Sequence, residues 1–517
     1  MTADPAPLPA VAVTPGGHRV LDGADVTTLA DLDALDRLDP ELVAALVITS
    51  EELAAASRHT RRLRKAGVTV VEVDPVRRSP LRRSDLQVGT SPGVADMLLL
   101  PTFDPLVTNP VGWRREPAVA LGVALHRPVD GPLSRWPSET DDVIVLAGPE
   151  LSGPARRAAV GEQQRAVSWD DDAALADRLR RVGVLVTDPA WEQEPTPVLR
   201  TIIHALAVGT PVVTTAAAPA AQLGLPVVTV DGPDELWSTA GDLAADHDRR
   251  EQVSVAGRRR VLRDHAGPAR LGRLLEAVGR PFPRAPRISV TFATNRGAFL
   301  EHGIRSIIGQ SVEDLEVILL LHGPEVPDPP AGLLEGSGRT FQVHRLPVEY
   351  HLGELLNHGI DHATGTYVAK MDDDDWYGRD HLLDLALAIE YSGADLVGKR
   401  IDHIYLSPLE RTVTRRRAAP ERDRPHVSGP TLFGRRDTMA RVRFGKLTGP
   451  EDSDFQRRLL EDGGRVYGTH SLDVVLNRHG GNTWDTDSQA LLDEAERDVA
   501  GLDLVATASE PGAYITD

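Results

Sequence analysis

Short apolar runs alternate with amphipathic stretches over residues 286–485. Three of these runs have the length and aliphatic content of buried strands, and they cover 288–293, 315–321 and 366–369. Between the first two runs, apolar residues recur on one helical face at Leu300, Ile304, Ile307 and Ile308. A second helical pattern precedes the third run. This β-α-β order predicts an α/β fold with a parallel sheet, and such sheets bind ligands beyond the carboxyl ends of their strands.

The first 280 residues show the same alternation in shorter segments. Mostly β-branched runs predict strands at 45–48, 68–73, 143–146 and 182–186. The prolines of 279–286 disfavour both helix and strand, so we place a domain boundary there. The predicted organisation is an α/β region over 1–130, a second α/β domain over 131–280, a third over 286–485 and an acidic tail over 486–517, with one helix near 490–499.

Composition narrows the class of protein. The chain has 517 residues, a formal net charge of -19 and no cysteine. The lack of cysteine excludes disulfides and thiolate metal sites and fits a reducing cytosol. Because an acidic chain repels phosphate backbones, we expect no nucleic-acid partner. The start through Gly17 lacks the pattern of a signal peptide, and prolines interrupt the weakly charged stretch at 201–230. We therefore expect a cytoplasmic protein.

Four consecutive aspartates, at 372–375, follow the third predicted strand of the C-terminal region. Two such carboxylates about 6 Å apart repel by about 3 kcal/mol at an effective dielectric near 20. Carboxylate oxygens with open positions suit Mg²⁺ or Mn²⁺, which also bind substrate phosphates. In an extended chain, Asp372 and Asp374 would share a face and could converge on one ion. The alternative is a solvated acidic turn, but the location at a strand end favours a nucleotide site.

Several segments of this region resemble family 2 glycosyltransferases of the GT-A fold, and the resemblance covers about two fifths of the chain. The segments are Thr-Asn-Arg at 294–296, Ser-Ile-Ile-Gly-Gln-Ser at 306–311, Leu-Asn-His-Gly-Ile at 356–360, Gly-Thr-Tyr-Val-Ala-Lys-Met-Asp at 365–372, Gly-Pro-Glu-Asp at 449–452 and Asn-Arg-His-Gly-Gly-Asn-Thr-Trp at 477–484. The resemblance implies that 286–485 is a GT-A nucleotide-sugar-binding domain with catalytic activity.

The resemblance also implies roles on the donor side of the site. Asp372 and Asp374 match the D-x-D pattern that holds Mn²⁺ or Mg²⁺, and His479 matches a histidine that completes the metal ligands in related enzymes. The cation would neutralise the departing diphosphate as a Lewis acid. Lys370 could contact the diphosphate or offset the aspartate charges. The full set expected to bind the donor is Asn295, Arg296, Lys370, Asp372 and Trp376.

On the acceptor side, the resemblance identifies Asp452 as the base that takes the proton of the attacking hydroxyl, as in inverting members of the family. Glu451 would orient the acceptor. Both residues precede a helical pattern, so they could equally serve as favourable charges at a helix N-terminus. Trp376 and Trp484 offer flat apolar faces for a sugar ring, or they are ordinary core aromatics.

Two features depart from the family patterns. Leu-His-Gly-Pro at 321–324 stands where most relatives carry an acidic pair that binds the nucleotide. Either that contact is lost or His322 replaces it with a different hydrogen bond, so the donor base is not defined. The segment 200–213, within a match over about 140–280, resembles the nucleotide side of GT-B glycosyltransferases of the group 1, spore-coat type. Its His204 replaces a glutamate that holds the donor ribose, and a neutral imidazole cannot accept two hydroxyl protons. We therefore expect a GT-B-like Rossmann domain over 131–280 that is non-catalytic.

The function predicted for the chain is a metal-dependent inverting glycosyltransferase of the hexosyltransferase type. It would transfer a sugar from a nucleotide-diphosphate sugar to a glycan, lipid-linked or cell-wall-type acceptor. The arginines at 415–417 could bind a phosphate-bearing acceptor near a membrane surface, or they form a solvated loop. Two alternatives remain: a sugar nucleotidyltransferase, which also needs a metal-held diphosphate, and a non-catalytic nucleotide-sugar-binding scaffold.

Overall fold

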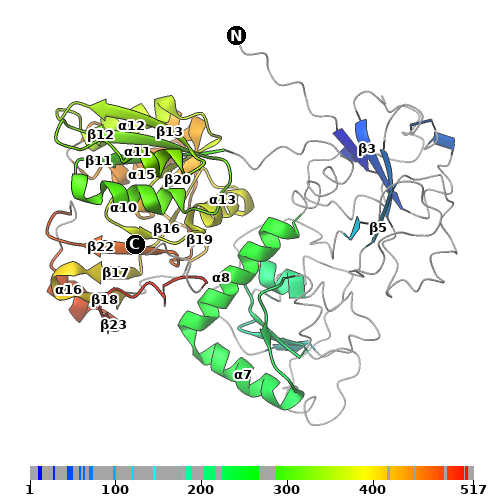
Figure 1. Cartoon of the computed structure of the whole chain (residues 1–517). Helices are drawn as coiled ribbons and strands as arrows, with labels where there is room; N and C mark the ends of the chain where they lie inside the picture. The colour runs from blue at the N-terminus through cyan, green and yellow to red at the C-terminus, as the bar shows by residue number, and fades with distance from the viewer. Residues whose placement is uncertain are drawn as a thin grey trace. The chain divides into compact units, whose positions relative to one another are not determined.

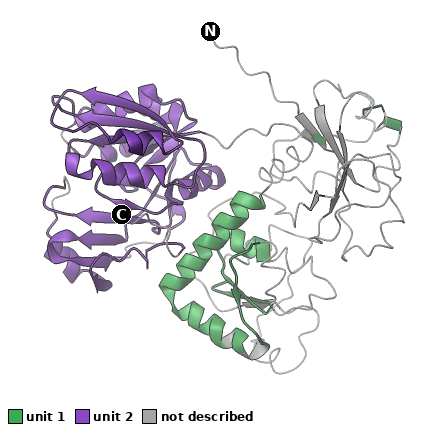
Figure 2. Ribbon diagram, viewed as in Figure 1, with its two compact units in different colours: residues 1–130, 140–283 green, residues 131–139, 284–517 purple. Residues whose placement is uncertain are grey.

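The computed structural model contains two compact units, residues 1–130 with 140–283 and residues 131–139 with 284–517 (Figure 2). The residues that the structure describes are 10–13, 27–28, 43–49, 58–59, 62–63, 69–73, 97–100, 119–120, 144–146, 179, 182–187, 202–215, 224–266, 287–415, 420–447, 449–482, 486–505 and 507–510.

The described strands of the first unit form two parallel sheets (Figure 1). One has six strands in the order β2-β1-β3-β4-β5-β6 and the other has four in the order β10-β9-β8-β7. The strand bounds are β1 Ala10–Val13, β2 Thr27–Thr28, β3 Val43–Thr49, β4 Thr69–Val73, β5 Met97–Leu100, β6 Val119–Ala120, β7 Ile144–Leu146, β8 Leu185–Thr187, β9 Val212–Thr214 and β10 Val228–Thr229. Helices α7 (Pro233–Ala245) and α8 (His247–Asp264) follow. The α/β class is confirmed, whereas the GT-B-like identity of 131–280 stays a prediction.

The second unit is built on an eight-stranded sheet in the order β13-β12-β11-β14-β20-β16-β21-β19. Its first four strands are parallel, as the β-α-β pattern predicts. Strand β20 then runs antiparallel to both of its neighbours, so the sheet as a whole is mixed. The bounds are β11 Ile288–Thr294, β12 Leu315–His322, β13 Thr340–Leu346, β14 Tyr367–Lys370, β16 Leu396–Lys399, β19 Arg422–Asp423, β20 Phe433–Arg435 and β21 Val466–Thr469.

Helices cover both faces of this sheet. Side chains of β12 alternate between two cores: Val317 and Leu319 pack in the core that holds α10 and α13, while Ile318 and Leu320 pack in the core that holds α12, α14 and α15. A strand buried on both faces reads as a continuous apolar run, which explains the pattern at 315–321. The helix bounds are α10 Gly297–Ile308, α11 Ala331–Glu335, α12 Leu352–His362, α13 His381–Ser392, α14 Arg436–Val442 and α15 Glu451–Glu461.

Helix α12 packs closely against the sheet where Gly359 faces it. A Cβ at this position would come within 2.6 Å of Thr291 Cγ2 on β11 and within 3.2 Å of Leu320 Cδ1 on β12. Any larger residue would therefore push the helix away from two central strands. The glycine fixes where the neighbouring residues of α12 stand above the sheet.

A five-stranded sheet, in the order β15-β22-β17-β18-β23, completes the second unit. The helix predicted at 490–499 is wrong in its second half, which forms the last strand of this sheet. Helix α16 ends at Asp493, and residues 497–500 instead pair with β18, their side chains alternating between half-buried and exposed. Pairing with a distant strand thus overrides the local helical pattern. The bounds are β15 Trp376–Tyr377, β17 His403–Leu406, β18 Arg411–Thr414, β22 Val474–Arg478, α16 Ser488–Asp493 and β23 Arg497–Ala500.

The arginine-rich segment after β18 is partly engaged within this unit. Arg411 pairs with Asp498, and the buried Arg415 pairs with Glu494. Residues 416–417 lie outside the described residues. In the described part of the chain, none of the helices combines the length and the apolar character needed to cross a bilayer.

Strand β17 buries a histidine that gives the fold a pH dependence. His403 is 3% exposed, and its Nδ1 lies 3.3 Å from the Thr414 hydroxyl. Burial lowers the pKa of His403 to about 4, and the positive charge of Arg497 acts in the same direction.

We expect His403→Leu to reduce the loss of stability in acid. Between pH 6.5 and 4 the unfolded chain binds a proton at His403 that the folded chain does not, so stability falls as the pH falls. From pH 7 to pH 5 the free energy of unfolding should drop by about 2 kcal/mol less in the variant than in the wild type. Urea unfolding at the two pH values measures this, and equal drops would show that His403 titrates normally.

Candidate active site

The four aspartates lie where the sequence pattern places them, at the carboxyl end of a central strand. Strand β14 ends at Lys370, and residues 373–375 form the bends that follow. Strand β11, its parallel neighbour, ends at Thr294, and Arg296 is the N-cap residue of α10. Because adjacent parallel strands end at the same edge, the acidic turn and the start of α10 meet there.

Asp373 anchors Arg296 in this turn. Its carboxylate is 2% exposed, accepts a hydrogen bond from the Thr294 hydroxyl, and accepts others from the guanidinium of Arg296, whose Nε lies 3.2 Å away. This two-pronged pairing fixes the plane of the guanidinium. Burial lowers the pKa of Arg296, but Asp373 and Asp374 outweigh it and leave the pKa above its ordinary value.

Asp374 gathers three side chains around one oxygen. Its Oδ2 lies 2.9 Å from Arg296 Nη1, 2.8 Å from His479 Nε2 and 3.0 Å from the Asn482 amide nitrogen. Gly481 N–H donates to His479 Nδ1 at 3.2 Å, which assigns the ring proton to Nε2 and makes that nitrogen the donor to Asp374. Asn482 Oδ1 also accepts from the backbone N–H of His479 at 2.6 Å, so Asn482 positions both neighbours.

Lys370 joins the donor and acceptor sides of the site. Its side chain is 4% exposed, and Nζ lies 2.7 Å from Asp372 Oδ1 and 3.3 Å from Asp452 Oδ2. Burial lowers the pKa of Lys370, but the two carboxylates outweigh it and raise the pKa above its usual value. Burial raises the pKa of the Asp372 carboxyl to about 6, against the opposing charge of Lys370.

The Glu-Asp pair opens α15 and lies just after the position that usually forms a side-chain capping bond. The N-cap residue is Pro450, which forms no such bond, and Asp452 turns towards Lys370 instead. Within the described residues, the buried Oδ1 of Asp452 has no hydrogen-bond partner. A Cβ at Gly429 would overlap the Asp452 carboxylate, so a glycine is needed beside it. Burial raises the pKa of Glu451, and the neighbouring Asp452 adds to that effect.

The remaining candidates differ in what surrounds them. Trp376 is half-buried, with its ring edge-to-face to His302 and to Tyr405 at centroid distances of 5.6 Å, so its observed contacts are packing contacts. Asn295 is exposed at the strand end. His322 ends β12 at the same edge of the sheet. Trp484 lies outside the described residues, so its expected acceptor contact stays a prediction.

The structure separates the proposed metal ligands into two groups. The premise that the acidic run is extended is wrong, because β14 ends before it and the chain bends. Asp374 and His479 are adjacent, whereas Asp372 faces Lys370. Arg296 Nη1, a cationic group, lies against the same two atoms, Asp374 Oδ2 at 2.9 Å and His479 Nε2 at 3.2 Å. Asp374 Oδ2 already attracts positive charge and suits a divalent cation, whereas His479 Nε2 could bind one only in the tautomer that carries the ring proton on Nδ1.

Sequence reasoning missed three residues that build the site. Asn482 lies in the same Gly-flanked segment as His479, and that proximity was the available signal. Asp373 pairs with Arg296, 77 positions away, which no local pattern could show. Asp375 Oδ1 accepts from Asn477 N–H at 2.9 Å and so ties the acidic turn to β22.

Comparisons with known proteins bear on this part of the chain. The family model described as glycosyl transferase family 2 matches residues 290–448, and no curated protein matches the chain. Residues 1–349 of S. aureus TarS in complex with UDP-GlcNAc are 17% identical over 40% of this chain and 64% of that chain, with a TM-score of 0.30. The chain therefore spans less than two thirds of that protein.

The mannosyltransferase PcManGT from Pyrobaculum calidifontis, in complex with GDP-Man and Mn²⁺, is 17% identical over 44% of this chain and 67% of that chain, with a TM-score of 0.28. The family model covers β11 through β20, which includes the acidic turn and Lys370. The resemblance stated for the C-terminal region is thereby confirmed over residues 290–448, whereas the segments at 449–452 and 477–484 lie beyond the match. Residues 290–448 match the family model described as glycosyl transferase family 2, so this part of the second unit is similar to that family.

Proposed function

We propose that the second unit transfers a hexose, with inversion, from a nucleotide-diphosphate sugar to a hydroxyl of a glycan, lipid-linked or cell-wall-type acceptor. The observation that carries this proposal is the position of Lys370. One buried ammonium contacts Asp372 at the end of β14 and Asp452 at the start of α15. The carboxylate expected on the donor side and the carboxylate expected to act as base therefore face each other across a single side chain.

On the donor side, the residues that would hold Mn²⁺ or Mg²⁺ are Asp374 and His479, with Asp372 from the same turn. When bound, the cation would act as a Lewis acid on the diphosphate. Arg296 is held within reach of the same atoms by Asp373, so its guanidinium is available for the negative charge of a phosphate. These roles use the carboxyl end of the sheet, where α/β folds bind nucleotides.

On the acceptor side, Asp452 supplies the base. The acceptor oxygen attacks the anomeric carbon, its proton passes to Asp452, and the bond from that carbon to the diphosphate oxygen breaks as the nucleoside diphosphate leaves. The Oδ1 of Asp452 suits this step, because its lone pairs are not used by any described residue while Oδ2 faces Lys370. Glu451, the residue before Asp452 in the first turn of α15, would orient the acceptor.

The site favours glycosyl transfer over nucleotidyl transfer. A nucleotidyltransferase would release pyrophosphate from a sugar phosphate and a nucleoside triphosphate, and it has no need for a base beside the acceptor. We assign the first unit a non-catalytic role as scaffold or acceptor-binding module, and we place the reaction in the cytoplasm. If the acceptor is linked to a lipid, the enzyme would bind it at the membrane surface as a peripheral protein.

We expect Asp452→Asn to lower kcat by about 10²- to 10⁴-fold while donor affinity changes little, because the amide cannot accept the proton. Nucleoside diphosphate released from UDP-GlcNAc, UDP-glucose and GDP-mannose with glycoside acceptors measures turnover, and calorimetry measures donor binding. Asp454→Asn is the matched control, since Asp454 lies in the same first turn but pairs with Arg457 and Arg458. Equal turnover of the two variants would remove Asp452 as the base.

Asp374→Ala should abolish the increase in donor affinity that Mn²⁺ produces, because Asp374 supplies an oxygen of the donor set. Calorimetric titration of each nucleotide sugar, with and without Mn²⁺, gives the two affinities. Asp373→Ala is an informative comparison, since it should disturb Arg296 without removing a metal ligand. Full Mn²⁺-dependent affinity in Asp374→Ala would refute the assignment.

We expect Lys370→Met to lower the free energy of unfolding by about 2 kcal/mol, because Asp372 and Asp452 then repel each other without compensation. The loss stays below that of a fully buried pair, since their side chains remain 35% and 18% exposed. Adding Asp372→Asn should recover most of the loss in a double-mutant cycle. If the changes in the free energy of unfolding caused by Lys370→Met and by Asp372→Asn simply add, the two side chains do not interact energetically and the prediction is wrong.

A further inference from the structure

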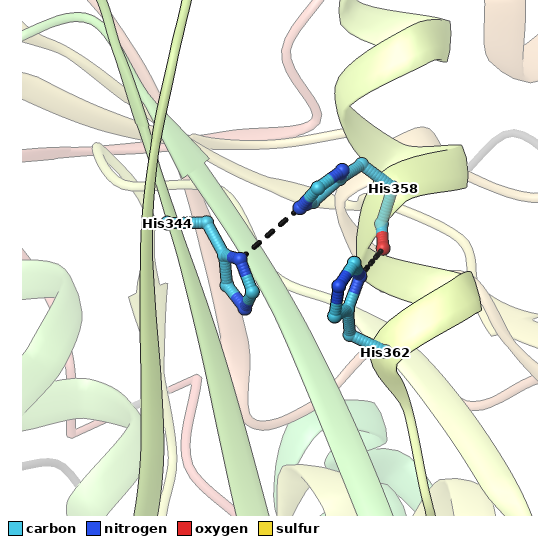
Figure 3. Close-up of side chains that lie close together, drawn as sticks. All are labelled: His344, His358 and His362. Atoms are coloured by element: carbon cyan, nitrogen blue, oxygen red, sulfur yellow. Dashed lines mark hydrogen bonds between the residues drawn. The ribbon is translucent and has the colours of Figure 1, made fainter.

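Three histidines gather at the edge of the eight-stranded sheet, on residues that the active site does not use. His344 lies on the edge strand β13, and His358 and His362 lie one turn apart on α12 (Figure 3). One ring nitrogen of each lies within 4.8 Å of the other two. In the part of the chain that the structure describes, this is the one such group of three or more histidine, aspartate or glutamate side chains.

The spacing of these rings suits a tetrahedral metal ion. His358 Nε2 lies 3.1 Å from His344 Nδ1, close to the roughly 3.3 Å between two nitrogens that share a zinc ion with bonds of about 2.0 Å. The ring centroids lie 4.2–4.8 Å apart. Residues four apart on a helix project from the same face, so α12 presents two imidazoles to one point and β13 supplies the third.

Hydrogen bonds outside the cluster orient two of the rings. His362 Nδ1 donates to the carbonyl oxygen of His358 at 2.8 Å, which leaves its Nε2 without a proton. Gln342 donates its amide to Glu316 and to the carbonyl of His362, so its Oε1 is the atom that faces His344 Nε2 at 3.4 Å. His344 therefore keeps its proton on Nε2 and turns the lone pair of Nδ1 inward. Metal-binding histidines are typically held by such outer hydrogen bonds.

Two of the rings, those of His344 and His358, favour the neutral form that binds metals. Burial lowers the pKa of His344, and the nearby His362 lowers it further. Burial likewise lowers the pKa of His358, and both other histidines add to the effect. Without a bound ion, the cluster has a single hydrogen bond between rings, from His358 to His344, and the lone pair of His362 points at no donor within the cluster.

We propose that His344, His358 and His362 form a site for a transition-metal ion of the zinc type, separate from the catalytic cation site. Three imidazoles favour Zn²⁺, Co²⁺ or Ni²⁺, whereas carboxylate oxygens favour Mg²⁺ and Mn²⁺. Water completes the fourth position, since His362 is exposed and the cluster opens to solvent. The ion would join edge strand β13 to α12, and the stabilisation would grow with the logarithm of its concentration once that concentration exceeds the Kd.

The test uses the untagged, full-length Asp374→Ala protein stripped with chelator, so that the catalytic site does not contribute. Titration with Co²⁺ should give the intense visible absorption of tetrahedral coordination, and titration with Zn²⁺ should displace it. Excess Zn²⁺ should also raise the Tm. His358→Asn and His362→Asn, each in this background, should weaken the site at least 100-fold and abolish both signals.

His351→Asn is the matched control, because His351 is the N-cap residue of the same helix and asparagine is also a good N-cap. It should bind Co²⁺ as the parent protein does. His362 is exposed, so its replacement leaves the core intact and keeps the test valid should His358→Asn fail to fold. If the parent shows no tetrahedral Co²⁺ spectrum, or if His362→Asn retains it, the proposed site does not exist.

Discussion

The active-site edge depends on balancing negative charge where a parallel strand ends. Four consecutive carboxylates cannot share a turn without nearby cations, since each close pair costs about 3 kcal/mol at the dielectric of a protein surface. The chain supplies two positive side chains from different directions. Lys370 comes from the strand itself and Arg296 from the start of α10, and between them they contact Asp372, Asp373 and Asp374. The turn is thereby compact before any substrate binds.

This balance divides the aspartates into two kinds. Asp373 and Asp375 are buried and hydrogen-bonded to the scaffold, one to β11 and Arg296, the other to β22. Asp372 faces Lys370, whereas Asp374, which is also buried, faces Arg296, His479 and Asn482. The shared face expected of Asp372 and Asp374 therefore gives way to a different arrangement: Asp374 lies with Asp373 against Arg296, and Asp372 lies against Lys370. A bend, rather than a strand, produces it.

Much of the second unit could be predicted from sequence because strands buried on both faces leave long apolar runs, as at β11 and β12. The location of the acidic turn followed from the same order of elements. Contacts between distant segments could not be predicted. Arg296 meets Asp373 across 77 positions, and Asn482 meets Asp374 across 108. The helix prediction for the segment that forms β23 failed for the same reason. Its partner β18 lies about 85 residues earlier, and only that pairing makes the segment extended.

Helix α12 shows how one element serves two purposes on two faces. Leu355, Leu356 and Gly359 face the sheet, where the glycine lets the helix settle against β11 and β12. His358 and His362 face the edge strand instead. The apolar stripe was visible in the sequence, but two histidines a turn apart are common on solvated helices and mean little alone. Only the close seating of the helix brings His344 to them, so the packing of the core determines the geometry of the surface cluster.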